Sequence, residues 1–159
     1  MSEPLFNLSN LAQILQDLAH DVAENYKEHL ELHDHVASGD LLRSISTEIE
    51  VRGTTYIVWL NLADYWKYVE YDTKPHWPPV DAIRRWIFIK PVIPRPLANG
   101  KLPTADQLAF LIGRKIATFG TKGAHDLQDT KDAVLPMYEE RLLEALQRDT
   151  LDYIEKVLP

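Results

Sequence analysis

Histidine and carboxylate side chains gather near the end of the first amphipathic stretch of the chain. His29 and His33 are four residues apart, so a helix would place both imidazoles on one face, and Asp34 and His35 follow directly. Two imidazoles and a carboxylate can hold a divalent metal that activates water for hydrolysis. The sequence shows no further ligand and no orienting group at a recognisable spacing. We therefore favour two solvated histidines on a charged helix face, and expect alanine there to leave folding largely intact.

A second group of titratable residues lies in the middle of the chain. Tyr71, His76 and Asp81 could form an acid–base set, because imidazole titrates near neutral pH and a carboxylate can orient it. Only nearness in sequence supports this group. The sequence has no serine in a nucleophile elbow, no glycine-rich phosphate loop and no cysteine. We therefore predict a protein that is not an enzyme, without catalytic, metal-binding or cofactor-binding residues.

Hydrophobic periodicity predicts the elements that position these residues. An amphipathic helix is indicated by apolar residues at spacings of three and four, namely Leu11, Ile14, Leu15, Leu18, Val22 and Tyr26. Ser38, Gly39 and Asp40 indicate a stop and a turn. Residues 44–52 alternate between apolar and polar, Gly53 follows, and residues 54–62 are rich in β-formers, which together predict a β-hairpin.

Helices and proline-rich loops are predicted for the rest of the chain. Residues 63–77 are dense in aromatic side chains and favour a short helix ending near Asp72, and residues 80–88 favour another after two prolines. Residues 90–103 contain four prolines and predict a projecting loop. Thr104 and Gln107 have capping-box spacing and open a helix that ends at Gly120. A final helix runs from about Gln128 almost to the C-terminus, and Pro136 either kinks or restarts it.

Length and composition predict a single domain over residues 1–159. With 45% hydrophobic residues the chain can bury one core. The expected fold class is α+β, with an antiparallel β-sheet whose central hairpin packs against several helices, and with a long proline-rich loop. No apolar run reaches the eighteen or so residues that span a bilayer, so we expect no membrane partner. The absence of cysteine fits folding in a reducing cytoplasm.

Charge is unevenly distributed along the sequence. Residues 74–122 hold nine Lys or Arg against two Asp, close to +7, whereas the whole chain is formally −7. The remainder is therefore near −14, and such a chain can attract its own copies head to tail. We expect aromatic and basic residues of the centre to contact neighbouring subunits or partners: Tyr71, Lys74, His76, Trp77, Arg84, Arg85, Lys90, Arg95, Lys101, Arg114 and Lys115.

Several runs of the sequence resemble one family of phage proteins. These runs are Ala37–Ile45 (ASGDLLRSI), Leu62–Tyr65 (LADY), Tyr68–Pro79 (YVEYDTKPHWPP), Ile83–Trp86 (IRRW), Ala109–Ile116 (AFLIGRKI) and Gly120–Gly123 (GTKG). In order and spacing they resemble the tailed-phage family of gene-ten-like neck, tail-completion or head-to-tail joining proteins. The resemblance spans about residues 37–123. Two positions depart from the family: Asp72 stands where a tight-turn Gly is common, and Gly113 where Ala is common.

The resemblance implies a structural virion protein rather than an enzyme. It implies a homo-oligomeric ring of six copies that joins the tail tube protein to the head-completion or connector protein. Genome DNA would pass through the lumen without specific binding. The expected location is the virion neck or tail, and the host cytoplasm during assembly. No catalytic residues accompany the motifs.

Two other functions remain open from the residues alone. A small metal-dependent hydrolase would use His29, His33 and nearby carboxylates. A nucleic-acid-binding accessory module would use Arg84, Arg85, Arg114 and Lys115, although the acidic balance of the chain disfavours it.

Overall fold

The computed structural model describes residues 8–53 and 55–158. In this part of the chain, six helices accompany a two-stranded antiparallel sheet, which confirms the α+β prediction. The contacts divide the chain into two compact units. Unit 1 comprises residues 1–33, 44–63 and 126–159, and unit 2 comprises residues 34–43 and 64–125. The single-domain expectation stays a prediction.

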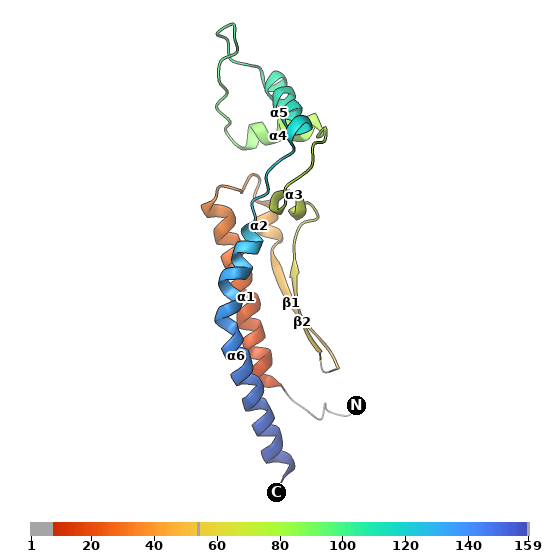
Figure 1. Cartoon of the computed structure of the whole chain (residues 1–159), viewed down its shortest axis with the longest axis vertical. Coiled ribbons are helices and arrows are strands. Elements are labelled where there is room, and N and C mark those ends of the chain that lie inside the picture. Colours follow the sequence, from red (N-terminus) through yellow and green to blue (C-terminus); the bar gives the residue numbers. More distant parts are fainter. Residues whose placement is uncertain (1–7, 54, 159) are drawn as a thin grey trace. The chain divides into compact units, whose positions relative to one another are not determined.

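Two long helices form the body of unit 1. Helix α1 (Ser9–Leu32) and helix α6 (Asp126–Val157) lie side by side (Figure 1) and pack through the apolar stripe that the sequence predicts. Leu18, Val134 and Tyr138 form the buried cluster, and Ile14, Leu15, Val22 and Leu142 pack around it. Pro136 lies inside α6, which is a single helix rather than two. None of the described helices has an apolar stretch long enough to cross a bilayer.

The β-hairpin also belongs to unit 1. Strand β1 (Ser46–Arg52) pairs with strand β2 (Thr55–Asn61) in a register that sets Ser46 opposite Asn61 and Arg52 opposite Thr55. Gly53 has a φ of 62°, the left-handed backbone that the tight connection requires. Both strands contact α1. The first strand starts later than the sequence predicts, because residues 40–44 form a single-turn helix, α2 (Asp40–Ser44), which the turn signals concealed.

Unit 2 contains short helices. Helix α3 (Trp66–Glu70) is followed by helix α4 (Val80–Ile89), which packs against helix α5 (Ala105–Phe119). The capping box of α5 is present as predicted: Thr104 Oγ1 accepts from the Gln107 N–H, and Gln107 Oε1 accepts from the Thr104 N–H. Residues 91–104 contain no helix or strand. The hydrophobic residues buried in unit 2 are Leu41, Ile83 and Ala109, a very small core.

Candidate functional site

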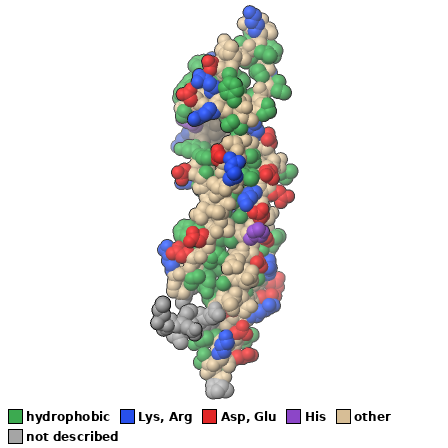
Figure 2. Space-filling view, turned by 180° about the vertical axis from the view of Figure 1, so that it is seen from behind, with side chains coloured by type: hydrophobic (Ala, Val, Ile, Leu, Met, Phe, Trp, Pro, Cys, Tyr) green, Lys and Arg blue, Asp and Glu red, His purple; other side chains and the backbone are tan. Residues whose placement is uncertain are grey.

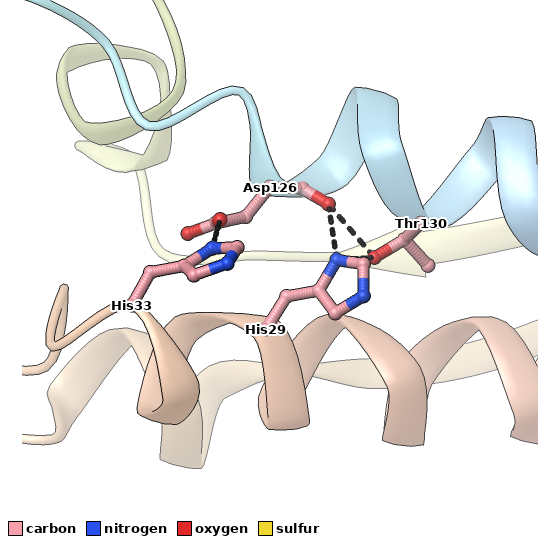
Figure 3. Close-up of polar contacts among 4 residues, drawn as sticks. All are labelled: His29, His33, Asp126 and Thr130. Carbon is pink, nitrogen blue, oxygen red and sulfur yellow. Dashed lines mark hydrogen bonds and ion pairs between the residues drawn. The ribbon is translucent and has the colours of Figure 1, made fainter.

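The two histidines singled out by their spacing meet the first turn of α6. His33 Nδ1 lies 2.6 Å from Asp126 Oδ1 (Figure 3), and the Asp126 side chain is fully buried. His29 Nδ1 lies 3.4 Å from the Asp126 carbonyl oxygen and 3.3 Å from Thr130 Oγ1. Thr130 Oγ1 in turn donates to the Asp126 carbonyl oxygen at 2.8 Å. The four residues form one polar cluster between two helices.

The expectation of solvated histidines is incomplete: the His33 side chain is 43% exposed, and it also contacts the buried Asp126. A buried carboxylate needs hydrogen-bond donors. When the His33 ring carries its proton on Nδ1, it donates a hydrogen bond to the Asp126 carboxylate. Both imidazoles therefore have a structural part: they tie the carboxyl end of α1 to the amino end of α6. The hydrogen bonds of the cluster join α1 to α6, two segments that are far apart in the sequence. Alanine at His33 is then expected to loosen this end of the helix pair rather than to be neutral.

A second buried carboxylate ties the opposite end of the pair. Asp149, only 2% exposed, accepts from the Asn10 N–H at 3.0 Å, the Asn10 Nδ2 at 2.8 Å and the Leu11 N–H at 2.8 Å. The first N–H groups of a helix have no intrahelical acceptor, and the side chain of the N-cap residue Leu8 makes no capping hydrogen bond. Asp149 supplies the acceptor and a negative charge at the positive end of the helix dipole.

Between the two ends, a tyrosine links the helices. Tyr138 donates its hydroxyl to Asp21 Oδ2 at 2.5 Å, and the Arg141 guanidinium lies 4.5 Å from the centre of its ring. Burial, followed by the hydrogen bond to Asp21, raises the pKa of the Tyr138 hydroxyl above its usual value of 10.0. Arg141 also contacts Asp17 at 3.2 Å. Polar contacts at three levels therefore fix the register of α1 against α6.

The second group of titratable residues is not brought together. His76 Nδ1 faces the Lys74 carbonyl oxygen at 2.8 Å, and Asp81 pairs with Arg84 at 2.8 Å. The Tyr71 ring contacts Trp66, with 5.8 Å between ring centres. Each of the three side chains has a different neighbour, so the described geometry gives no support to an acid–base set.

The close approach of two backbone segments explains the glycines of the GTKG run. Residues 121–125 lie along residues 69–73: Thr73 and Thr121 form a β-bridge, and the Ala124 N–H donates to the Val69 carbonyl. A Cβ at Gly123 would lie 2.2 Å from the Glu70 carbonyl oxygen, and one at Gly120, whose φ is 72°, would lie 1.9 Å from that of Thr73. Only glycine fits at either position.

Asp72 has a role that differs from the expected turn. Its backbone is not in the left-handed region, which among the described non-glycine residues is adopted by Asp34 and His125. Its carboxylate instead accepts from the Gly123 N–H at 2.8 Å and lies 3.4 Å from His125 Nε2. The hydrogen bond from Gly123, with the nearby His125, lowers the pKa of Asp72. A side chain thus fastens the two segments together.

Most of the predicted basic interface residues have no carboxylate partner in the described structure. Arg84 pairs with Asp81 and Asp106, and Lys90 pairs with Asp34. Among the described residues, no ion pair involves the other cations of the set, namely Lys74, Arg85, Arg95, Lys101, Arg114 and Lys115. Unpaired surface cations are available to an external anion or to an acidic protein surface.

Formal charge separates between the two units. The sequence of unit 1 holds 17 Asp or Glu and 6 Lys or Arg, a formal charge of −11. The sequence of unit 2 holds 7 Asp or Glu and 11 Lys or Arg, a formal charge of +4. The uneven charge along the sequence therefore corresponds to two compact units, one with a negative and one with a positive formal charge.

Unit 2 also exposes much of its apolar surface. Twelve of its large hydrophobic residues are exposed, and Ile93 and Phe119 reach 92% and 75%. Apolar side chains are visible among charged ones over the face drawn in Figure 2. Trp77 is half exposed and contacts Phe110, with 5.7 Å between ring centres. A shallow hollow of about 420 Å³ lies beside them, lined by Leu97, Asp106, Gln107, Phe110 and Leu111.

No protein-family model, no curated protein and no solved structure matches this chain. The family resemblance of the sequence runs stays a prediction, and the function built on it is a proposal. The physical features that bear on that proposal are the opposite charges of the units and the exposed apolar surface of unit 2.

Proposed function

We propose that this chain is a structural virion protein of a tailed phage that forms a ring at the head-to-tail interface. In this role the protein binds copies of itself and its axial neighbours, and it makes or breaks no covalent bond. The ring joins the tail tube to the head connector, in the position known as the neck or tail-completion site.

The observation that carries this proposal is the surface of unit 2. A stable monomer rarely leaves large apolar patches in water, and larger patches mark sites covered by a partner. Unit 2 buries three hydrophobic residues and exposes twelve large ones, and most of its predicted interface cations form no ion pair within the described part of the chain. Aromatic residues and arginine are also the types enriched in protein interfaces. Such a surface favours a subunit that is covered in its assembly.

The charge of the two units supports a ring in particular. Repeating one contact between two different patches around a rotation axis closes a ring, and each subunit must then carry two complementary surfaces. Unit 1 is acidic and unit 2 is basic, which is the complementarity that such a contact needs. In this proposal the ring has six copies. It contacts a connector protein on its head side and a tail tube protein on its tail side, and DNA passes through its lumen.

The location of the protein in virions tests this function. Purified virions labelled with gold-conjugated antibody against this chain should carry the label at the head-to-tail junction, and mass spectrometry should find the chain in the particle. A phage whose copy of the gene is disrupted should yield separate heads and tails. Intact, infectious virions that contain none of this chain would refute the proposal.

A nucleic-acid-binding module is the second candidate, because Arg114 and Lys115 are exposed on α5 and pair with no described carboxylate. Binding through phosphates weakens steeply with salt, in proportion to the number of phosphates contacted. Titration of a short duplex at two salt concentrations distinguishes the two functions. The ring proposal predicts no binding at physiological salt, whereas a module predicts tight binding that falls steeply as salt rises.

A further inference from the structure

Helix α6 carries apolar residues on two opposite sides. Val134, Tyr138 and Ala145 face the core of unit 1. At about 100° per residue, a second row of residues falls on the opposite side of the helix. This row has steps of three, four, four and three, and consists of Leu143, Leu146, Thr150, Ile154 and Val157. Its four aliphatic members are exposed. We call this row, together with Asp129, Asp132, Glu139 and Glu140, the outer face of α6.

The charged residues of the outer face are all acidic. Asp129, Asp132, Glu139 and Glu140 fall on this side of α6, and all four are exposed. The four cations of the helix, Lys131, Arg141, Arg148 and Lys156, fall on other sides. No described cation forms an ion pair with Glu139 or Glu140. The outer face is therefore acidic in its first half and apolar in its second, and the described residues of unit 1 leave its apolar half exposed.

Helix α5 presents a surface of the opposite kind. Phe110 and Leu111 are exposed and line the hollow with Leu97. Arg114 and Lys115 follow one turn later, both exposed and both without an ion pair in the described structure. We call these four α5 residues, with Leu97, the α5 face. It is apolar first and basic second along the chain.

We propose that the outer face of α6 in one copy packs antiparallel on the α5 face of the next copy. This inference rests on the ring proposed above, because a contact between two different faces repeats head to tail. On α6 the acidic residues Glu139 and Glu140 come four and three residues before Leu143. On α5 the apolar pair comes four residues before the basic pair. Running the helices in opposite directions therefore places acid on base and apolar on apolar at the same time.

Charge reversal and its rescue test the contact in the intact chain. R114E/K115E should weaken self-association, because it sets like charges against the outer face of α6. E139K/E140K should do the same from the other side. The four changes together in one chain should restore association. We expect each double variant to lower the association constant about tenfold or more at low salt, and the combined variant to return it to about the wild-type value.

The control for E139K/E140K also replaces two carboxylates of unit 1 with lysine, but on α1 and away from the outer face. E28K/E31K changes two exposed residues of α1 and should associate as the wild type does. L146S, an exposed position, should weaken association at low and high salt alike, since apolar burial is not screened. Circular dichroism confirms that each variant is folded. Sedimentation velocity and native mass spectrometry measure the association.

Four results would overturn the inference. The first is a combined variant that associates no better than either double variant. The second is a control that weakens association as much as E139K/E140K. The third is a wild-type chain that stays monomeric at every concentration. Contact between two outer faces of α6 would also overturn it, and would be seen as association unaffected by R114E/K115E. The proposed function fails separately, if the chain is absent from the head-to-tail junction of virions.

Discussion

Asp149 and Leu11, 138 residues apart in sequence, meet where α1 begins: the Asp149 Oδ2 atom accepts the Leu11 N–H at 2.8 Å. The same carboxylate accepts the Asn10 N–H, so one side chain of α6 caps the start of another helix. Capping of this kind normally comes from the residue that precedes the helix. Here it couples the formation of α1 to its docking on α6.

Replacing Asp149 should therefore destabilise unit 1. D149A removes the acceptor for two backbone N–H groups and should lower the free energy of unfolding by about 2 kcal/mol. D149N keeps one acceptor oxygen and should cost roughly half as much. D152A, an exposed carboxylate one turn further on, is the control and should change stability by less than about 0.5 kcal/mol. Urea unfolding followed by circular dichroism measures all three. Equal stability of D149A and D152A would contradict the cap.

Tyr138 predicts a loss of stability at alkaline pH. Its pKa is raised in the folded protein above the usual 10.0, so the folded state holds the proton more tightly than the unfolded state does. The resulting stability is fully present below pH 10 and is lost as the pH rises through the folded pKa. Y138F lacks this proton, so its stability should fall less than that of the wild type between about pH 9 and 11.

Y138F should also be less stable than the wild type at neutral pH, by about 1–2 kcal/mol, because Asp21 loses a donor. Urea midpoints measured across the pH range give both effects. A variant whose stability falls with pH as steeply as that of the wild type would show that the Tyr138 hydroxyl does not contribute to this loss.

Two glycines of unit 2 should respond in opposite ways to alanine. A Cβ at Gly113 would lie 3.5 Å from Ile83 and 3.8 Å from Trp77, ordinary contact distances, and the residue is inside α5. G113A should therefore stabilise the protein by about 1 kcal/mol. G123A places its Cβ against the Glu70 carbonyl and should cost about 2 kcal/mol or more. Thermal unfolding compares the two, and a stabilising G123A would refute the close approach of the segments.

His33 should contribute to stability through Asp126. H33A removes a donor from a buried carboxylate and should lower the free energy of unfolding by about 1 kcal/mol. H20A changes an exposed imidazole on the same helix and should be near neutral. Chemical unfolding at a single fixed pH compares the two variants. No difference between them would restore the interpretation of His33 as a solvated side chain.

Local signals in the sequence predicted much of the fold. The hairpin follows from alternation around Gly53, and the start of α5 follows from Thr104 and Gln107, whose reciprocal bonds depend only on their spacing. Helix α2 was missed because its single turn lies within a stretch of turn-forming residues. Local pattern is sufficient where the stabilising contacts are themselves local.

The polar links of unit 1 could not be predicted in the same way. Asp126 and Asp149 are two of nine carboxylates in α6, and only the docking of α1 decides which of them become buried. One weak signal was present: Asp126 and Asp149 are 23 residues apart in the sequence, close to the length of α1. The role of Asp72 likewise depends on Gly123, a residue 51 positions away.

The most direct test of the central claim is a reconstruction of the virion neck by electron cryomicroscopy. If the chain is a structural ring subunit, density between the connector and the tail tube will fit copies of units 1 and 2 arranged around the tail axis. An outer face of α6 would then meet an α5 face at each contact. A neck whose density is fully explained by other proteins would contradict the claim.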